Sequence, residues 1–181
     1  GDLHIDDSFF YLPESDPAEF DRQPLRAYNV EPNALLMNFK VVRYWFEPLH
    51  GSNTVHVWLD PPLENVNVDN RLSLRPGSCS GYQRGITISA NEAVDRMTFS
   101  GKFPSGCKHY AMDRTALSQN EFVYGLFISL WRESGGEFKG GWRNAVAPGD
   151  LEPNFSFKSL PLADVITYVN KHSNNVMARH L

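Results

Sequence analysis

The sequence lacks a basic tract, a long apolar run and a targeting segment. Its 181 residues hold 17 Lys and Arg against 21 Asp and Glu, which gives a formal net charge of −4. Proteins that bind nucleic acid mainly through phosphate contacts normally carry a basic patch, so the charge argues against that class. No apolar stretch approaches the roughly 18 residues that a membrane-spanning helix needs, and we recognise no signal peptide.

Cysteine is scarce as well. The chain has two, Cys79 and Cys107, and neither lies in a C-x-x-C or zinc-finger spacing. They would pair in an oxidising compartment and stay free in the cytosol. We expect free, buried thiols, with a Cys79–Cys107 disulfide as the alternative.

Aromatic residues and chain breakers are plentiful instead. The sequence has 12 Phe, 7 Tyr and 4 Trp, and its 13 Gly and 12 Pro interrupt the chain too often for a helical bundle. Residues 1–30 contain seven acidic residues and two arginines, a net charge of −5, so the remaining residues sum to +1. We therefore predict an extended acidic arm attached to one globular domain.

Alternation of apolar and polar residues with a period of two predicts most of the secondary structure as β-strand. The alternating segments are Thr54–Leu59, Gly85–Ser89, Val94–Phe103, Glu121–Trp131 and Asn154–Leu160. Breakers such as Arg75-Pro76-Gly77 separate them. Short strands spaced by turns favour a β-sandwich or a barrel.

Two segments have helical spacing. Apolar residues recur at three- and four-residue steps in Pro32–Phe46, which predicts a short amphipathic helix that runs into an extended stretch from Arg43. A second helix is predicted from Leu162, followed by a polar, mobile tail over 171–181. The predicted regions are thus an arm (1–30), a central domain (31–161) and a C-terminal helix and tail (162–181).

Several of these segments together resemble picornavirus-like jelly-roll capsid proteins. Residues 32–161 contain, in the family's order, a helix ending in Leu-Leu and Phe, an aromatic and a Gly-Ser, alternating strands, and a last strand followed by proline. The matching positions are Leu35, Leu36, Phe39, Trp45, Gly51, Ser52, Gly149, Asp150, Phe155, Phe157 and Pro161. The stretch Phe46–His50 splits the family's W-R-G-S pattern.

The resemblance implies an all-β fold, an eight-stranded antiparallel jelly-roll β-sandwich with one or two short helices. It implies a structural coat protein of a small icosahedral RNA virus, located in the virion and in the host cytoplasm during assembly. Its partners would be other copies and sister capsid proteins, enclosed viral RNA and a host receptor. Gly1 would then be the product of polyprotein cleavage, and Phe9, Phe10 and Tyr11 of the arm would pack poorly in an isolated subunit. The alternative is a receptor- or glycan-binding β-sandwich module.

Catalytic patterns are weak. Cys79 lies in a G-x-C-x-G pattern similar to the nucleophile turn of viral cysteine proteases, but no histidine follows at the required distance. His50 and Ser52 could join Asp60 or Asp69 in a Ser-His-Asp set, yet nothing places Ser52 on a strand-to-helix elbow. We read both as loop residues, so the prediction is that the protein is not an enzyme and has no catalytic residue.

Metal and ligand patterns are also weak. His4 with Asp6 and Asp7, or His50 with His56, lacks a third ligand at a known spacing. Asp60, Glu64 and Asp69 lack the calcium-loop pattern. The four tryptophans, Trp45, Trp58, Trp131 and Trp142, could form a base- or sugar-stacking surface, although packing is the commoner use. The sequence thus predicts no metal site and no cofactor site.

Overall fold

The computed structural model describes residues 1–13, 15–81 and 85–181 of the chain. The chain divides into two compact units. One contains Met37–Phe138, and the other combines Gly1–Leu36 with Lys139–Leu181. The predicted division into arm (1–30), central domain (31–161) and tail (162–181) stays a prediction.

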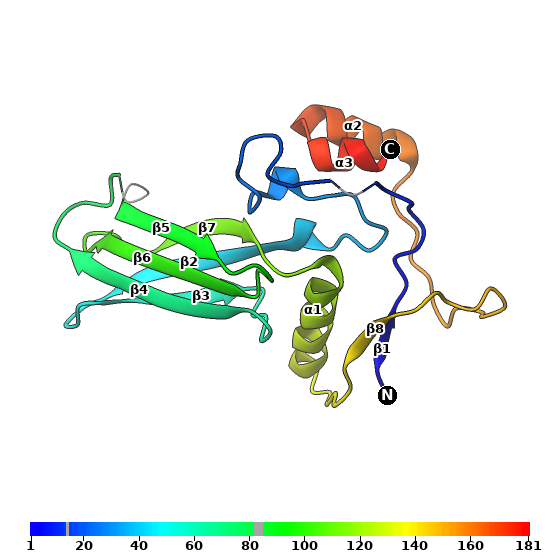
Figure 1. Ribbon diagram of the computed structural model, residues 1–181, viewed down its shortest axis with the longest axis horizontal. Coiled ribbons are helices and arrows are strands. Elements are labelled where there is room, and N and C mark those ends of the chain that lie inside the picture. Colours follow the sequence, from blue (N-terminus) through cyan, green and yellow to red (C-terminus); the bar gives the residue numbers. More distant parts are fainter. Residues whose placement is uncertain (14, 82–84) are drawn as a thin grey trace. The chain divides into compact units, whose positions relative to one another are not determined.

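The unit Met37–Phe138 holds two three-stranded sheets (Figure 1). The first has the order β3-β2-β7 and is antiparallel; its strands are β2 (Val41–Leu49), β3 (Thr54–Asp60) and β7 (Tyr110–Thr115). The second has the order β4-β6-β5; its strands are β4 (Asn67–Arg75), β5 (Ile86–Ala90) and β6 (Arg96–Pro104). In it β4 runs parallel to β6 and β5 runs antiparallel to it.

The two sheets bury their facing sides against each other. Alternate residues of β2 point inward, and Tyr44 and Phe46 are fully buried. Their rings meet Phe99 of β6 at centroid distances of 5.0 and 5.1 Å, and Phe46 also stacks on Phe103. Because successive side chains of a strand face opposite sides, the odd-numbered residues of β2 are left on the outer face of its sheet.

The segment predicted as a strand at Glu121–Trp131 is a helix, α1 (Gln119–Glu133). Ser118 and Glu121 form a capping box that starts it, and this sequence signal outweighs the alternation. Its buried residues Phe122, Val123 and Ile128 follow helical spacing. The period-two reading was wrong because a helix rich in apolar residues on several sides alternates by chance over a few positions.

The helix predicted within Pro32–Phe46 is also wrong. The structure has a single turn, η2 (Asn38–Lys40), and then β2 from Val41. Asn38, Phe39 and Lys40 have φ angles of 45, 51 and 54°, in the left-handed region that non-glycine residues rarely adopt. The turn ends where the alternation of β2 begins, so the period of two describes this segment better than helical spacing does.

The second unit combines segments from both ends of the chain. Strand β1 (Leu3–Ile5) pairs in parallel with β8 (Trp142–Asn144), and the helices are η1 (Ala27–Asn29), α2 (Leu162–His172) and α3 (Asn175–His180). The helix from Leu162 is confirmed. The tail that was expected to be mobile forms α3 instead, because Val176 is buried and the Arg179 guanidinium donates to the Val30 carbonyl.

The expected strand at Asn154–Leu160 is not formed. Phe155 and Phe157 are 80% and 94% exposed, so the alternation there has no sheet to pack against. In the arm, Phe9 and Tyr11 are exposed as expected, whereas Phe10 contacts the rings of Phe9 and His180.

These features contradict the all-β, eight-stranded antiparallel jelly roll. The fold mixes several small sheets with helices, β4 and β6 are parallel, and the longest element is α1. A jelly roll has two sheets of antiparallel strands only. No helix within the described parts of the chain is both long and apolar enough to cross a membrane.

Candidate functional site

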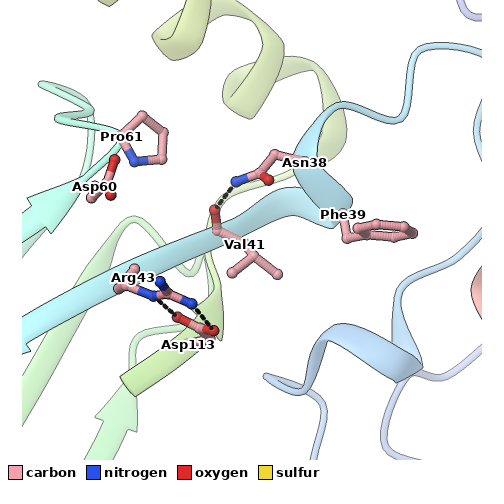
Figure 2. Close-up of a pocket in the computed structure, with 7 residues that line it drawn as sticks. All are labelled: Asn38, Phe39, Val41, Arg43, Asp60, Pro61 and Asp113. Atoms are coloured by element: carbon pink, nitrogen blue, oxygen red, sulfur yellow. Dashed lines mark hydrogen bonds and ion pairs between the residues drawn. The ribbon is translucent and has the colours of Figure 1, made fainter. Parts of the chain in front are cut away.

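A cleft of about 420 Å³ opens at one end of the β3-β2-β7 sheet (Figure 2). The turn η2, the start of β2, the end of β3 and one residue of β7 form its walls. The lining residues are Asn38, Phe39, Val41, Arg43, Asp60, Pro61 and Asp113. Asp60 and Asp113 flank Arg43 in the strand register, so the three charged side chains belong to neighbouring strands.

Arg43 and Asp113 form a two-pronged ion pair on one wall of the cleft. Arg43 Nε lies 2.7 Å from Asp113 Oδ1, and Nη2 lies 2.9 Å from Oδ2 (Figure 2). The hydrogen bond from Arg43 holds the pKa of Asp113 below its usual value, and the same bond raises the pKa of Arg43. Both side chains are nearly half exposed, so the pair is accessible to a polar ligand.

The turn η2 supplies another part of the lining. Its three left-handed residues cost about 1–2 kcal/mol each relative to ordinary backbone, and the Asn38 side chain stabilises the turn by donating to the Val41 carbonyl at 2.9 Å (Figure 2). The Ala116 amide also donates to the Lys40 carbonyl. Strained backbone that is held in this way often borders a binding site.

The outer face of the same sheet carries aromatic rings next to the cleft. Trp45 of β2 and Trp58 of β3 are register partners, and their ring centroids are 5.9 Å apart with the rings nearly parallel. His56 stacks on Trp58 at 5.1 Å, and His109 lies 5.7 Å from Trp45. The Arg43 guanidinium lies 5.8 Å from the Trp45 ring centre, which joins the cleft to the aromatic face by a cation–π contact.

Cys79 is not a nucleophile, and the expectation of free thiols is wrong. Cys79 and Cys107 form a disulfide that links the loop after β4 to the loop after β6. The Ser105 amide donates to the Arg75 carbonyl, and the Gly106 amide donates to the Gly77 carbonyl. These two hydrogen bonds bring the loops together. Strand pairing thus brings the two cysteines close together. Their spacing in the sequence does not show this.

The suggested Ser-His-Asp set is not assembled. Ser52 lies in the β2–β3 hairpin, where its hydroxyl bonds the Leu49 carbonyl and the Thr54 hydroxyl. Asp69 pairs with Arg71 on β4, and Asp60 lines the cleft. The serine is therefore a turn residue with its hydrogen bonds already made.

No metal cluster of three or more ligands forms among the residues that the structure describes. His4, one of the residues weighed as metal ligands and rejected, accepts a hydrogen bond from Arg143, and Asp6 accepts bonds from Ser8 and from the Ala147 amide. These bonds tie β1 to the β8 region. The histidine and the aspartate thus have structural roles.

The four tryptophans do not form one surface. Trp45 and Trp58 share the outer sheet face, whereas Trp131 stacks on Phe127 of α1 and Trp142 lies in β8. Sequence reasoning suggested the stacking surface but missed the Arg43–Asp113 pair. A signal was present in the outward positions of β2, where Arg43, Trp45 and Glu47 alternate with buried residues.

Comparison with known proteins gives a family and a fold. A model of the D-Ala-D-Ala carboxypeptidase 3 (S13) family matches residues 1–181. The chain resembles the crystal structure of penicillin binding protein 4 from Haemophilus influenzae, with 14% identity, a TM-score of 0.65, and coverage of 85% of this chain and 34% of that one. The same protein complexed with a β-lactam gives 13% identity and a TM-score of 0.59, and covers 78% of this chain and 32% of that one. No curated protein sequence matches.

These matches correct the functional predictions. The picornavirus-like capsid resemblance is wrong, and so are the partners and the virion location that it implied, because the matched family is a peptidase family. The prediction that the protein is no enzyme is contradicted for the same reason, and the alternative of a receptor- or glycan-binding sandwich module has no support from the comparisons. Because the family model extends over every residue of the sequence, the chain belongs to the D-Ala-D-Ala carboxypeptidase 3 (S13) family.

Proposed function

We propose that this chain is the wall-binding part of a D-Ala-D-Ala carboxypeptidase, an enzyme that removes the terminal D-alanine from the peptides of peptidoglycan. The observation that carries the proposal is the family match over residues 1–181. The chain spans about a third of the penicillin binding protein 4 structure that it resembles, so the activity of the whole family enzyme is itself part of the proposal.

We assign a binding role to these residues rather than the acylation step. Penicillin-binding proteins use the serine of an S-x-x-K motif as nucleophile, together with S-D-N and K-T-G motifs. Ser105-Gly106-Cys107-Lys108 matches S-x-x-K by its letters. However, the Ser105 amide donates to the Arg75 carbonyl at 2.8 Å and Cys107 is disulfide-bonded. The tetrad is thus a tethered turn beside β4, which favours a structural role.

A second partial match is structural too. Ser118-Gln119-Asn120 differs from S-D-N at its middle residue. Ser118 is the N-cap of α1, and its hydroxyl accepts a hydrogen bond from the Glu121 amide while the Glu121 carboxylate accepts one from the Ser118 amide. A capping hydroxyl that stabilises a helix end is poorly suited to proton transfer in an acylation reaction.

The disulfide supports a location outside the cytosol. Disulfides persist in oxidising compartments such as the bacterial periplasm and are rare in reducing ones. The Cys79–Cys107 bond joins two loops at one end of the β4-β6-β5 sheet. A wall-directed enzyme works in the compartment where such a bond is kept, so this supports the proposed substrate.

Intact-mass spectrometry after incubation with a penicillin tests the assignment of roles. We expect the mass of the chain to stay unchanged, because Ser105 lies in a turn without the geometry of an activated nucleophile. Ser105→Ala is the matched control. A stoichiometric penicilloyl adduct on the chain that is lost in Ser105→Ala would overturn the binding-only role.

Cosedimentation with purified peptidoglycan tests the wall-binding role. The chain is mixed with insoluble peptidoglycan, centrifuged, and quantified in pellet and supernatant. We expect saturable binding, with the protein moving to the pellet as peptidoglycan is increased. A chain that stays in the supernatant at every concentration, while its circular dichroism shows it to be folded, would contradict the proposal.

A further inference from the structure

The outer face of the β3-β2-β7 sheet carries a cluster that we call the aromatic row: Trp45, Trp58, His56 and His109. The ring centroids of Trp45 and Trp58 are 5.9 Å apart at an interplanar angle of 9°. His56 continues the row beyond Trp58, at 5.1 Å and 27°, and His109 flanks Trp45 at 5.7 Å. The rings therefore form one continuous strip across β2 and β3.

The aromatic row does not belong to the core. Trp45 lies between Tyr44 and Phe46, which are fully buried against β6, so its own ring points to the other side of the sheet. Trp45 and Trp58 are half-buried, and His56 and His109 are exposed. Packing between the two sheets thus accounts for the burial of the Tyr44 and Phe46 rings. It does not account for the rings of the aromatic row, which lie on the other face.

Charged side chains flank the two tryptophans. Strand register places Glu47 opposite His56 and Arg43 opposite Asp60, on either side of the Trp45–Trp58 pair. Arg43 also holds Asp113 of β7. One side of the Trp45–Trp58 pair therefore opens on the cleft with two carboxylates and a guanidinium, and the other side carries Glu47.

This mixture favours a sugar over a protein partner. The centre of a protein–protein interface is depleted of charged residues, whereas here charged groups adjoin the Trp45–Trp58 pair on both sides. A pyranose ring has a face of C–H groups that packs on an aromatic ring, and hydroxyl and acetamido groups on its rim that need hydrogen-bond partners. Carboxylates and guanidinium groups placed beside flat rings meet both needs.

We propose that the aromatic row binds the sugar rings of the peptidoglycan glycan strand, with the cleft residues Arg43 and Asp60 bonding the polar rim of the adjoining sugar. The proposal rests on the proposed function and narrows it, because it assigns recognition to the glycan rather than to the stem peptide. Trp45 and Trp58 would each stack on one sugar, so loss of either ring weakens binding without altering the buried core.

Titration with soluble N-acetylglucosamine oligosaccharides, followed by tryptophan fluorescence and by calorimetry, tests this site. We expect saturable binding by the wild-type chain. Trp45→Ala and Trp58→Ala should each weaken it about tenfold, the effect of losing one stacked ring. Trp58→Phe should bind the oligosaccharides more tightly than Trp58→Ala and less tightly than the wild type. Trp131→Phe on α1 is the matched control and should bind like the wild type.

The outcomes separate this proposal from the proposed function. If the folded chain sediments with peptidoglycan but does not bind the oligosaccharides, or if Trp45→Ala and Trp58→Ala bind as well as the wild type, the sugar site is wrong and the wall-binding role stands. Self-association that disappears in the tryptophan variants, without sugar binding, would show that the row is a protein interface and would overturn the proposal. Absence of sedimentation would overturn the wall-binding role itself.

Discussion

Arg43 on β2 and Asp113 on β7 are register partners whose side chains form two parallel hydrogen bonds, of 2.7 and 2.9 Å. The pair joins the central strand of its sheet to an edge strand at the mouth of the cleft. Arg43 also contacts Trp45 through its guanidinium. One arginine therefore connects the cleft to the aromatic row, and its position depends on Asp113.

The ion pair should make stability depend on pH in the acid range. Arg43 lowers the pKa of Asp113 in the folded state, so the pair's contribution is complete above the unfolded pKa of about 3.9 and is lost as pH falls through the folded pKa. We expect Asp113→Asn to be slightly less stable at neutral pH, since exposed pairs contribute little, and to lose less stability than the wild type on acidification. Urea unfolding at several pH values measures this. Parallel pH profiles of the two proteins would contradict it.

Phenylalanine at position 44 should give a more stable fold than the tyrosine that is present. Its hydroxyl is buried and has no hydrogen-bond partner among the described residues, and burial raises its pKa. Because an unpaired buried hydroxyl costs about 1–3 kcal/mol, we expect Tyr44→Phe to raise the free energy of unfolding by about 1 kcal/mol. Equilibrium denaturation measures the change, with Phe46→Leu as a destabilising control. A clear loss of stability in Tyr44→Phe would show that the hydroxyl has a partner.

Replacing Gly125 of α1 by alanine should lower the stability of the fold, although alanine inside a helix is more favourable than glycine by about 1 kcal/mol. A Cβ at this position would overlap with Asn65 Oδ1, and the Asn65 amide donates to the Glu121 carbonyl at 2.8 Å. We expect Gly125→Ala to lower stability by about 1 kcal/mol net, because the displaced asparagine loses its bond.

A double-mutant cycle checks that reason. Asn65→Ala removes the obstructing side chain, so Gly125→Ala made in that background should be neutral or stabilising. If Gly125→Ala costs the same with and without Asn65, the close approach of the two residues is not the cause.

The disulfide should matter for stability but not for the aromatic row. The bond closes a loop with a sequence separation of 28 residues, for which chain entropy predicts about 3.5 kcal/mol. We expect the Cys79→Ser/Cys107→Ser variant to unfold at lower denaturant concentration and to keep its oligosaccharide affinity when folded. A thiol assay of the denatured, unreduced wild type should find no free thiol, and two free thiols would contradict the pairing.

Strand prediction succeeded where one face of a strand is buried and the other is open. The alternation in Thr54–Leu59, Gly85–Ser89 and Val94–Phe103 corresponds closely to β3, β5 and β6. It failed at α1, where apolar residues surround much of the helix and the capping box was the better signal. It also failed around Phe155 and Phe157, where the alternation is real but the two rings are exposed and the segment forms no strand.

The candidate site is formed by residues that strand pairing brings together, and the sequence alone does not show which strands pair. Trp45 and Trp58 are 13 positions apart and meet through the β2–β3 register, and Arg43 reaches Asp113 through a long-range strand pairing. The capsid resemblance combined short motifs whose order matched but whose expected elements did not form, as at the helix expected near Phe39. Motifs of a few residues recur by chance, so they identify a family only when the predicted elements form around them.

Peptidoglycan glycan strands from which an amidase has removed the stem peptides give the sharpest test of the glycan-binding surface. Binding of the folded chain to these strands, captured on beads through their reducing ends, is compared with its binding to beads that carry cross-linked peptidoglycan fragments captured in the same way. We predict equal binding to both, and loss of binding to both in the Trp45→Ala/Trp58→Ala variant. Binding that requires the stem peptides, or that the double variant retains, would contradict the assignment of the wall-binding surface to the aromatic row.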